Sequence, residues 1–322
     1  MTLLRSLFVA IPLFLTFGPA ARGEVTLTQS DGRIRVDVDG DLFTEYHFEG
    51  QRKPILYPVI GPHGIGMTRN YPMVPDSTGE AHDHPHHQSI WFTHGNINGV
   101  DFWSIAKEAG TVHHEAFQKL ENGAQQAVLA STNRWVSEPG KLICTDSREL
   151  VFLVDGEDRS VDWTITIHAS EGDVTFGDTK EGAMGIRTNP LLRLAASPDR
   201  GVPSVTGKAV NSEGDEGNAL WGKRARWVDY WGTIQNHVVG IAIFDHPENP
   251  RHPTWWHART YGLVAANPFG IHNFENKPAG VGDFTLPSGQ SLTFRYRFVF
   301  HQGDAEQANV KERYDIFADS SQ

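Results

Sequence analysis

The sequence predicts a mainly β protein, a large antiparallel β-sandwich with a C-terminal helix. From residue 25 onward, short runs of alternating apolar and polar residues are divided by Gly, Pro, Asn and Asp. Turn signals recur roughly every 8–12 residues, which is typical of sandwich strands. Only one segment, near the C-terminus, has the pattern of a long helix. No internal repeat is visible, which disfavours a β-propeller.

Residues 1–23 have the layout of a secretory signal peptide. Arg5 precedes the apolar run LFVAIPLFLTF, and small residues follow it up to Gly23, which is the usual order of such a signal. The run is too short to span a bilayer, and no later stretch is long and apolar enough, so no membrane insertion is expected. We therefore predict an exported protein, periplasmic or extracellular, in which residues 24–322 form a single domain.

Composition excludes several classes of partner and site. The formal net charge is −11, from 28 basic and 39 acidic residues, which argues against nucleic acid as a partner. The only cysteine, Cys144, excludes a disulfide framework and a cysteine-rich metal site. Motifs of serine hydrolases, P-loop enzymes and dinucleotide-binding enzymes are absent from the sequence, so no cofactor is favoured. The sequence gives no indication of the oligomeric state.

The first third of the chain is predicted to contain a hairpin and two strands. Residues 33–48 should form the hairpin, because two β runs meet at Asp39-Gly40. A short strand at 55–60 leads into an irregular loop at 61–85, and loops of that length are usually functional or disordered. Residues 89–94 read as the next strand.

Alternation within the strand at 89–94 assigns its two faces. Ile90, Phe92 and His94 should share one face, and Trp91 should lie on the other. Residues 103–108 are expected to form one or two helical turns.

The remainder of the chain is predicted to be strand after strand. The expected strands are 126–136, 149–154, 160–169, 191–195, 208–211, 226–234, 238–244 and 292–300. Residues 149–154 and 238–244 are apolar on both faces, which indicates interior strands. Residues 160–169 alternate, which indicates a strand with one wet face.

Two polar loops and one helix complete the prediction. Residues 211–218 form an acidic loop, and residues 245–273 form a longer loop rich in His, Pro and Trp. The helix should begin at Asp304, with Gln307 as its capping-box partner, and run to about Ala318.

Five of the sixteen histidines gather between residues 80 and 103. They are His82, His84, His86, His87 and His94. The spacing of the first three would place them on one face of an extended chain, where they could bind a divalent metal. Alternatively, they bind a polar ligand or transfer protons, with Trp91 offering a flat apolar surface. A third interpretation is that they are loop residues that make structural hydrogen bonds.

A second candidate segment is FGDTKEGAMGIR, at residues 176–187. Its glycines would let the backbone approach a ligand closely. Lys180 and Glu181 are candidate catalytic residues, and Asp178 and Arg187 are candidate substrate-binding residues. The alternative is a surface turn with a screened ion pair.

The loop at 245–273 supplies the third set of candidates, predicted to bind substrate. They are Asp245, His246, His252, Trp255, His257, Tyr261 and Asn267, beside Trp91 and His94. Aromatic rings cover the C–H face of a sugar, and polar side chains bind its hydroxyls, so this mixture is typical of a carbohydrate site. Alternatively, one or both tryptophans belong to the core.

Four runs resemble a bacterial domain-of-unknown-function family that has been labelled methane oxygenase PmoA. They are HPHHQSIWFTHGNINGVDFW, FGDTKEGAMGIR, WVDYWG and IAIFDHPENPRHPTWWHARTYGLVAANPFG. A particulate methane monooxygenase subunit is an integral membrane protein, and the absence of a spanning segment argues against that label. The family looks like a galactose-mutarotase-type β-supersandwich. The resemblance implies a carbohydrate substrate, with His86 or His87 as acid and Glu181 as base.

Three hypotheses about function remain open. The first is an exported enzyme, a lyase, hydrolase or epimerase acting on a sugar or glycoside, with His86, His87, Lys180 and Glu181 as its catalytic residues. The second is a noncatalytic glycan-binding module. The third is a metal enzyme that uses His82, His84 or His86. The first gains support if His86, Glu181 and His257 lie in one cleft, and the second gains support if they are scattered.

Overall fold

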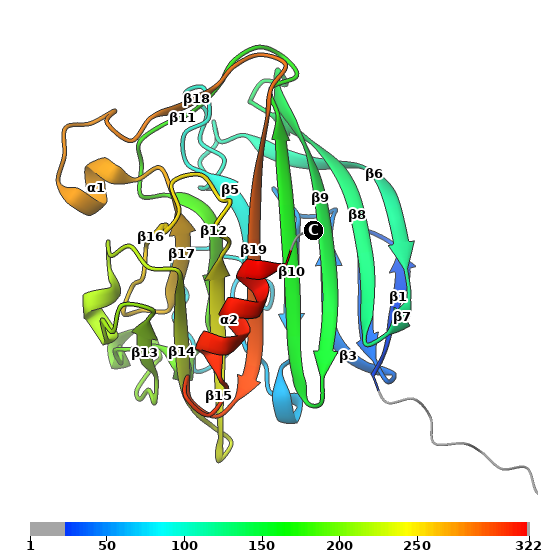
Figure 1. The fold of residues 1–322 in the computed structure, drawn as a ribbon, viewed down its shortest axis with the longest axis vertical. Coiled ribbons are helices and arrows are strands. Elements are labelled where there is room, and N and C mark those ends of the chain that lie inside the picture. The colour runs from blue at the N-terminus through cyan, green and yellow to red at the C-terminus, as the bar shows by residue number, and fades with distance from the viewer. Residues whose placement is uncertain (1–22, 321–322) are drawn as a thin grey trace, which may run out of the picture.

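Two large antiparallel sheets form the body of the protein (Figure 1). The structure is a computed structural model that describes residues 23–320. The predicted signal peptide falls almost entirely in residues 1–22, outside the described residues, so it remains a prediction together with export. No helix in the described part of the chain is long and apolar enough to cross a membrane.

The first sheet has nine strands and includes the predicted N-terminal hairpin. In spatial order its strands are β16 (Trp255–Trp256), β17 (Leu263–Asn267), β12 (Gly182–Arg187), β5 (Ile90–His94), β4 (Ile55–Val59), β3 (Asp41–His47), β2 (Arg33–Val38), β1 (Glu24–Ser30) and β7 (Gly123–Ala124). The β2–β3 hairpin confirms the prediction for residues 33–48.

The second sheet has eight strands. In spatial order they are β13 (Lys208–Asn211), β14 (Trp227–Ile234), β15 (His237–Asp245), β19 (Ser291–Gln302), β10 (Asp158–His168), β9 (Leu142–Asp155), β8 (Gln126–Val136) and β6 (Thr111–Glu121). A small sheet pairs β11 (Val174–Phe176) with β18 (Phe284–Leu286). The helices are α1 (Ile271–Glu275) and α2 (Val310–Asp319), and short 3₁₀ turns lie at Pro62–Gly64, Pro190–Leu192, Pro198–Arg200 and Gly217–Leu220. The predicted mainly β sandwich with a C-terminal helix is confirmed.

The main core lies between the two sheets and follows the predicted alternation. Ile90 and Phe92 belong to this core, whereas Trp91 packs in a separate cluster on the other face of β5. In β19, Phe294 and Phe298 are fully buried in the same core. Each such side chain contributes about 1.5–3 kcal/mol through burial.

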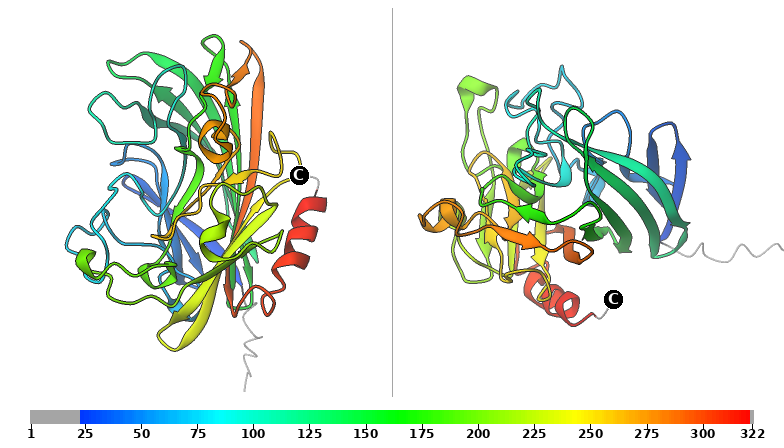
Figure 2. Two further views of the ribbon diagram at one scale, coloured as in Figure 1. Left: turned by 90° about the vertical axis from the view of Figure 1, so that its left-hand side faces the viewer. Right: turned by 90° about the horizontal axis from the view of Figure 1, so that it is seen from above.

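Helix α2 covers the outer face of the eight-stranded sheet (Figures 1 and 2). Tyr314 and Phe317 pack there against Phe244. The predicted capping box forms, since the Asp304 carboxylate accepts from the backbone N–H of Gln307 and the Gln307 side chain accepts from that of Asp304. The regular helix nevertheless begins only at Val310, because Asn309 has a positive φ of 52° that interrupts it.

Three local predictions were wrong. Residues 103–108 form bends and a turn rather than helical turns. Residues 191–195 are not a strand, since the Asn189 side chain accepts from the N–H of Leu191 and holds a 3₁₀ turn at Pro190–Leu192. The loop predicted at 245–273 contains β16, β17 and α1.

A buried ion pair joins two strands of the eight-stranded sheet. His301 Nε2 lies 2.9 Å from Asp229 Oδ1, and neither side chain is exposed. The imidazole ring of His301 occupies the space above Gly240, where a Cβ would lie 2.3 Å from His301 Cε1. Burial opposes the charged ring, but the charge and hydrogen bond of Asp229 raise the pKa of His301 above its usual value.

We expect Asp229→Asn to destabilise the protein most at mildly acid pH. Because the folded pKa of His301 is raised, its contribution is fully present below the unfolded value of about 6.5 and is lost as pH rises through the folded value. The free energy of unfolding in urea should fall by about 1.5–3 kcal/mol at pH 6, and by less at pH 9.5. Asp315→Asn, which removes an exposed partner of Lys311 on α2, is the matched control. A loss that grows with pH would contradict this account.

Candidate functional site

The outer face of the nine-stranded sheet carries a row of residues drawn from three strands and from the residue that follows β16. Trp91 on β5 pairs with Gly185 on β12, Gly185 pairs with Ala265 on β17, and Ala265 exchanges backbone hydrogen bonds with His257. Directly paired residues lie on the same face of a sheet. Trp91 and His257, which are 166 positions apart in the sequence, therefore project from one surface.

Gly185 is required on this face because two indole rings occupy the space above it. A Cβ at this position would lie 2.8 Å from Trp91 Cζ2 and 3.1 Å from Trp103 Cη2. The segment GAMGIR is therefore a buried strand whose glycine accommodates aromatic side chains. Residues 182–187 are therefore not part of a surface turn.

Arg69 fixes the backbone of the histidine-rich loop. Its guanidinium, 2% exposed, donates to the carbonyl oxygens of Ala81, Asp83, His84 and His87 over distances of 2.9–3.3 Å. The Arg69 side chain therefore satisfies four backbone carbonyl groups of this loop, in place of the backbone pairing that a strand or helix would supply.

Asp83 holds this loop against the sheet. Its carboxylate lies 2.8 Å from Arg69 Nη1, 2.9 Å from Arg187 Nη2 and 3.4 Å from Arg200 Nη1. Burial would raise the pKa of Asp83, but its contact with His84 and the charges of Arg187 and Arg69 hold that pKa well below its usual range. Asp83 is therefore ionised at neutral pH.

Four nearly parallel aromatic rings pack together on this surface, with His84 beside both His87 and Tyr261. The ring of His87 lies 5.5 Å from that of Trp91 and 4.9 Å from that of His84, and the ring of His84 lies 5.1 Å from that of Tyr261. Arg187 packs over Tyr261 at 4.6 Å and lies 3.2 Å from Nδ1 of His87. Because Arg187 can only donate, Nδ1 of His87 accepts and its Nε2 carries the proton.

His86 projects beside these rings and is only half-buried. Its ring meets that of His87 edge-on at 4.3 Å. Burial and the charge of Lys53 lower the pKa of His86 to about 4, and Glu181 acts in the opposite direction. His86 is therefore a neutral imidazole at pH 7, able to accept a proton.

Lys53 is a buried amine under the histidine loop. Its Nζ donates to the carbonyl of His86 at 2.9 Å and lies 5.2 Å from the ring of Trp91. Burial lowers the pKa of Lys53 to about 7. Sequence reasoning missed this residue, because a lysine next to Pro54 at a strand start carries no recognisable signal.

The DTKEG turn lies against the same surface. His257 Nδ1 donates to the carbonyl of Lys180 at 2.9 Å, and Lys180 Nζ lies 2.7 Å from the Glu181 carboxylate. Burial and the charges of Arg259 and Lys180 lower the pKa of His257 to about 3. The charge of Glu181 acts to raise the pKa of both His86 and Tyr261.

Several buried polar atoms on this surface have no hydrogen-bond partner in residues 23–320. They are His87 Nε2, Trp91 Nε1, Thr93 Oγ1, Trp103 Nε1 and His257 Nε2. Buried polar groups in folded proteins are nearly always satisfied, so water or a ligand is expected to bond to these atoms. We call the surface formed by His84, His86, His87, Trp91, Glu181, Arg187, His257 and Tyr261 the histidine cluster.

Some predicted residues hold the elements beneath the cluster. Asp178 accepts from the N–H groups of His272 and Gly282, and the Asn267 side chain donates to the carbonyl of Thr179. His94 lies on the core face of β5, where Nε2 donates to the carbonyl of Gly177. Their contacts indicate that they position the loops.

Other predicted residues lie outside the histidine cluster. Trp255 donates to Glu275. Asp245 accepts from His252 and from the N–H of Thr254, which orders the proline-rich turn. His246 packs against Phe317 of α2, the helix that covers the eight-stranded sheet.

The three histidines proposed as metal ligands do not converge. His82 stacks on Tyr71 at 4.5 Å and contacts the carbonyl of Ser77, whereas His84 and His86 lie in the cluster. Within residues 23–320, no group of three or more His, Cys, Asp or Glu side chains is arranged to hold a metal ion.

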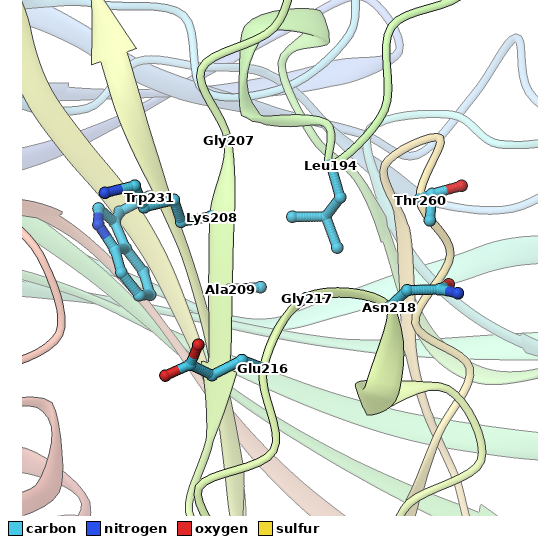
Figure 3. A pocket seen from close by; sticks show the side chains of 9 residues that line it. All are labelled: Leu194, Gly207, Lys208, Ala209, Glu216, Gly217, Asn218, Trp231 and Thr260. Carbon is cyan, nitrogen blue, oxygen red and sulfur yellow. The ribbon is translucent and has the colours of Figure 1, made fainter.

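A depression of about 590 Å³ lies beside β13 and the loop that contains Thr260 (Figure 3). Its lining is Leu194, Gly207, Lys208, Ala209, Glu216, Gly217, Asn218, Trp231 and Thr260. Thr260 lines this depression, while its neighbours Arg259 and Tyr261 face the cluster. The carbonyl of Thr260 accepts from the N–H of Leu194 and fixes this loop.

The chain belongs to a family of unknown function, DUF6807, whose model matches residues 33–315. This finding agrees with the domain-of-unknown-function family expected from the motifs, but it does not carry the methane oxygenase label. Comparison with curated proteins gave no match.

Solved structures with partial similarity include three carbohydrate-related proteins by their titles. A galactose mutarotase-like protein from Lactobacillus casei is 8% identical, with a TM-score of 0.36, covering 86% of this chain and 100% of that one. A putative aldose 1-epimerase from Escherichia coli K12 is 11% identical, with a TM-score of 0.34, covering 87% and 99%. A polysaccharide lyase is 9% identical, with a TM-score of 0.33, covering 91% of this chain and 34% of that one. These likenesses are too low to assign a site, so the function rests on the cluster itself.

Proposed function

We propose that the protein is an exported enzyme that acts on a sugar or glycoside through acid–base chemistry at the histidine cluster. One observation supports this proposal above all. Three segments far apart in the sequence, which contribute His86, Glu181 and His257, meet on one sheet face together with unpartnered buried polar atoms. The stacked rings of His84 and Tyr261 offer a flat surface for the C–H face of a sugar.

His86 is best suited to accept a proton. With a pKa lowered to about 4 it is neutral at pH 7, which reverses the role of acid that the mutarotase resemblance implied. The Glu181 carboxylate, held by Lys180, favours the imidazolium that forms on proton transfer. A lyase, a hydrolase and an epimerase all need such a base, acting on a sugar C–H, on water or on a hydroxyl.

The proposal is tested by replacing the two titrating groups. Turnover by the wild-type protein is first sought by NMR with a panel of neutral and acidic mono- and oligosaccharides. His86→Gln and Glu181→Gln should each lower kcat/KM by about 10²–10⁴-fold. His82→Gln, outside the cluster, is the matched control and should retain activity. The pH profile should rise through about pH 4 and stay level to neutrality, following the pKa of His86.

Retention of full turnover by both cluster variants would end the acid–base assignment. A rising limb near pH 6.5, the value for an unperturbed histidine, would remove His86 as the base.

A noncatalytic glycan-binding module is the second candidate. The Lys180–Glu181 ion pair at 2.7 Å favours the binding module, because Lys180 occupies the carboxylate that the enzyme proposal needs for catalysis. This alternative predicts that Tyr261→Ala abolishes binding of a glycan that the wild-type protein never converts.

A further inference from the structure

Arg259 is a cation beside the histidine cluster that has no acid of its own. Its guanidinium makes no hydrogen bond or ion pair with any side chain in the described part of the chain. It lies 5.7 Å from the ring of Tyr261 and 5.9 Å from that of Trp221. The two rings hold the guanidinium in place without neutralising it.

The other charges around Tyr261 are already paired. Asp83 contacts Arg69, Arg187 and Arg200, and Glu181 contacts Lys180. Positive charge is therefore in excess at this surface, although the whole chain has a formal net charge of −11. Such a local excess on an acidic protein favours binding of an anion at this place.

His257 lies within reach of the same excess charge. His257 and Arg259 lie two positions apart on an extended segment whose N–H groups donate to the carbonyls of Ala265 and Leu263, so their side chains project from one face. The charges of Arg259, Lys180 and His84 act to lower the pKa of His257. Its Nε2 is a buried acceptor with no partner among residues 23–320, which is suited to a sugar hydroxyl. An acceptor for a hydroxyl and a free guanidinium thus lie side by side.

We infer that the cluster binds a sugar that carries a carboxylate, with Arg259 as the residue that recognises the acid group. This inference rests on the proposed function and names its substrate class. A planar guanidinium pairs with a planar carboxylate through two parallel hydrogen bonds. The Trp221 and Tyr261 rings hold the guanidinium in place, which reduces the entropy lost on binding.

Calorimetric titration with defined sugars tests the inference. The probes are D-glucuronate, D-galacturonate, glucose, galactose and D-glucose 6-sulfate. At least one uronate should bind the wild-type protein about tenfold or more tightly than its neutral counterpart, and less tightly as salt is raised. Arg259→Gln should abolish this preference, and Arg259→Lys should restore part of it. Arg226→Gln, which removes an arginine packed on Tyr314 of α2, is the matched control.

The outcomes separate this inference from the proposed function. Equal binding of uronate and neutral sugar, or an unchanged preference in Arg259→Gln, overturns the inference, even if His86 and Glu181 prove catalytic. Preference for the sulfate over both uronates also overturns it. Arg259-dependent binding of a uronate that is never converted supports the inference and counts against the enzyme proposal.

Discussion

Replacement of Asp83 by alanine should lower the free energy of unfolding by about 3–5 kcal/mol, because it leaves two buried guanidinium groups without an acid. Arg69 and Arg187 are 2% and 1% exposed. Their charges cannot be solvated in place, so the loop must open to hydrate them. The loss should be measured by urea unfolding at pH 7. Asp199→Ala, which removes an exposed carboxylate 3.9 Å from Arg200, should change stability by less than about 0.5 kcal/mol.

The pH dependence of the same change identifies its cause. Since the folded pKa of Asp83 is held below its usual range, its contribution is present above the unfolded value of about 3.9 and is lost as pH falls through the folded value. The difference between wild type and Asp83→Ala should therefore be constant from pH 7 to pH 5 and shrink only below about pH 4. A difference that disappears between pH 7 and pH 5 would show that the arginines are not what Asp83 stabilises.

The sandwich could be predicted because its signal is periodic. Alternation in the strands at 160–169 and 292–300 correctly gives the residues that face the core, such as Trp163 and Phe294. Strand β12 was missed because its glycines read as a turn. Glycine is needed in β12 because rings such as that of Trp91 occupy the space above the strand. The position of these rings is set by tertiary packing, which leaves no local sequence pattern.

The site was predicted only in part for a related reason. Residue types pointed to the histidine loop and to the segment with His257, and the structure brings both to one face. They could not separate His257, inside the cluster, from His252, which orders a turn through Asp245. Lys53 and Arg69 act through backbone carbonyls of a distant loop, and no sequence spacing reports such bonds.

We expect Asp146→Ala to lower the free energy of unfolding by about 3–5 kcal/mol, because it leaves the charge of Arg148 unpaired inside the sandwich. This position lies far from the histidine cluster. Asp146 accepts from Asn133 Nδ2 at 2.6 Å, from Trp135 Nε1 at 2.7 Å and from Arg148 Nη2 at 2.8 Å. The side chains of Asp146 and Arg148 are completely buried. Loss of the carboxylate leaves three donors unsatisfied, and each buried unpaired group adds its own cost. Urea unfolding measures the loss, with exposed Asp76→Ala as the control.

A double variant separates the charge from the packing in this network. Asp146→Leu combined with Arg148→Met removes both charges, and replacing a buried ion pair by apolar residues is often close to neutral. The double variant should therefore be more stable than Asp146→Ala, although Asn133 and Trp135 still lack their acceptor. If it is less stable than the single variant, the unpaired charge of Arg148 is not the main cost of Asp146→Ala. Because the network lies in the core and the histidine cluster on the outer face of the other sheet, sugar binding per folded molecule should be unchanged in both variants.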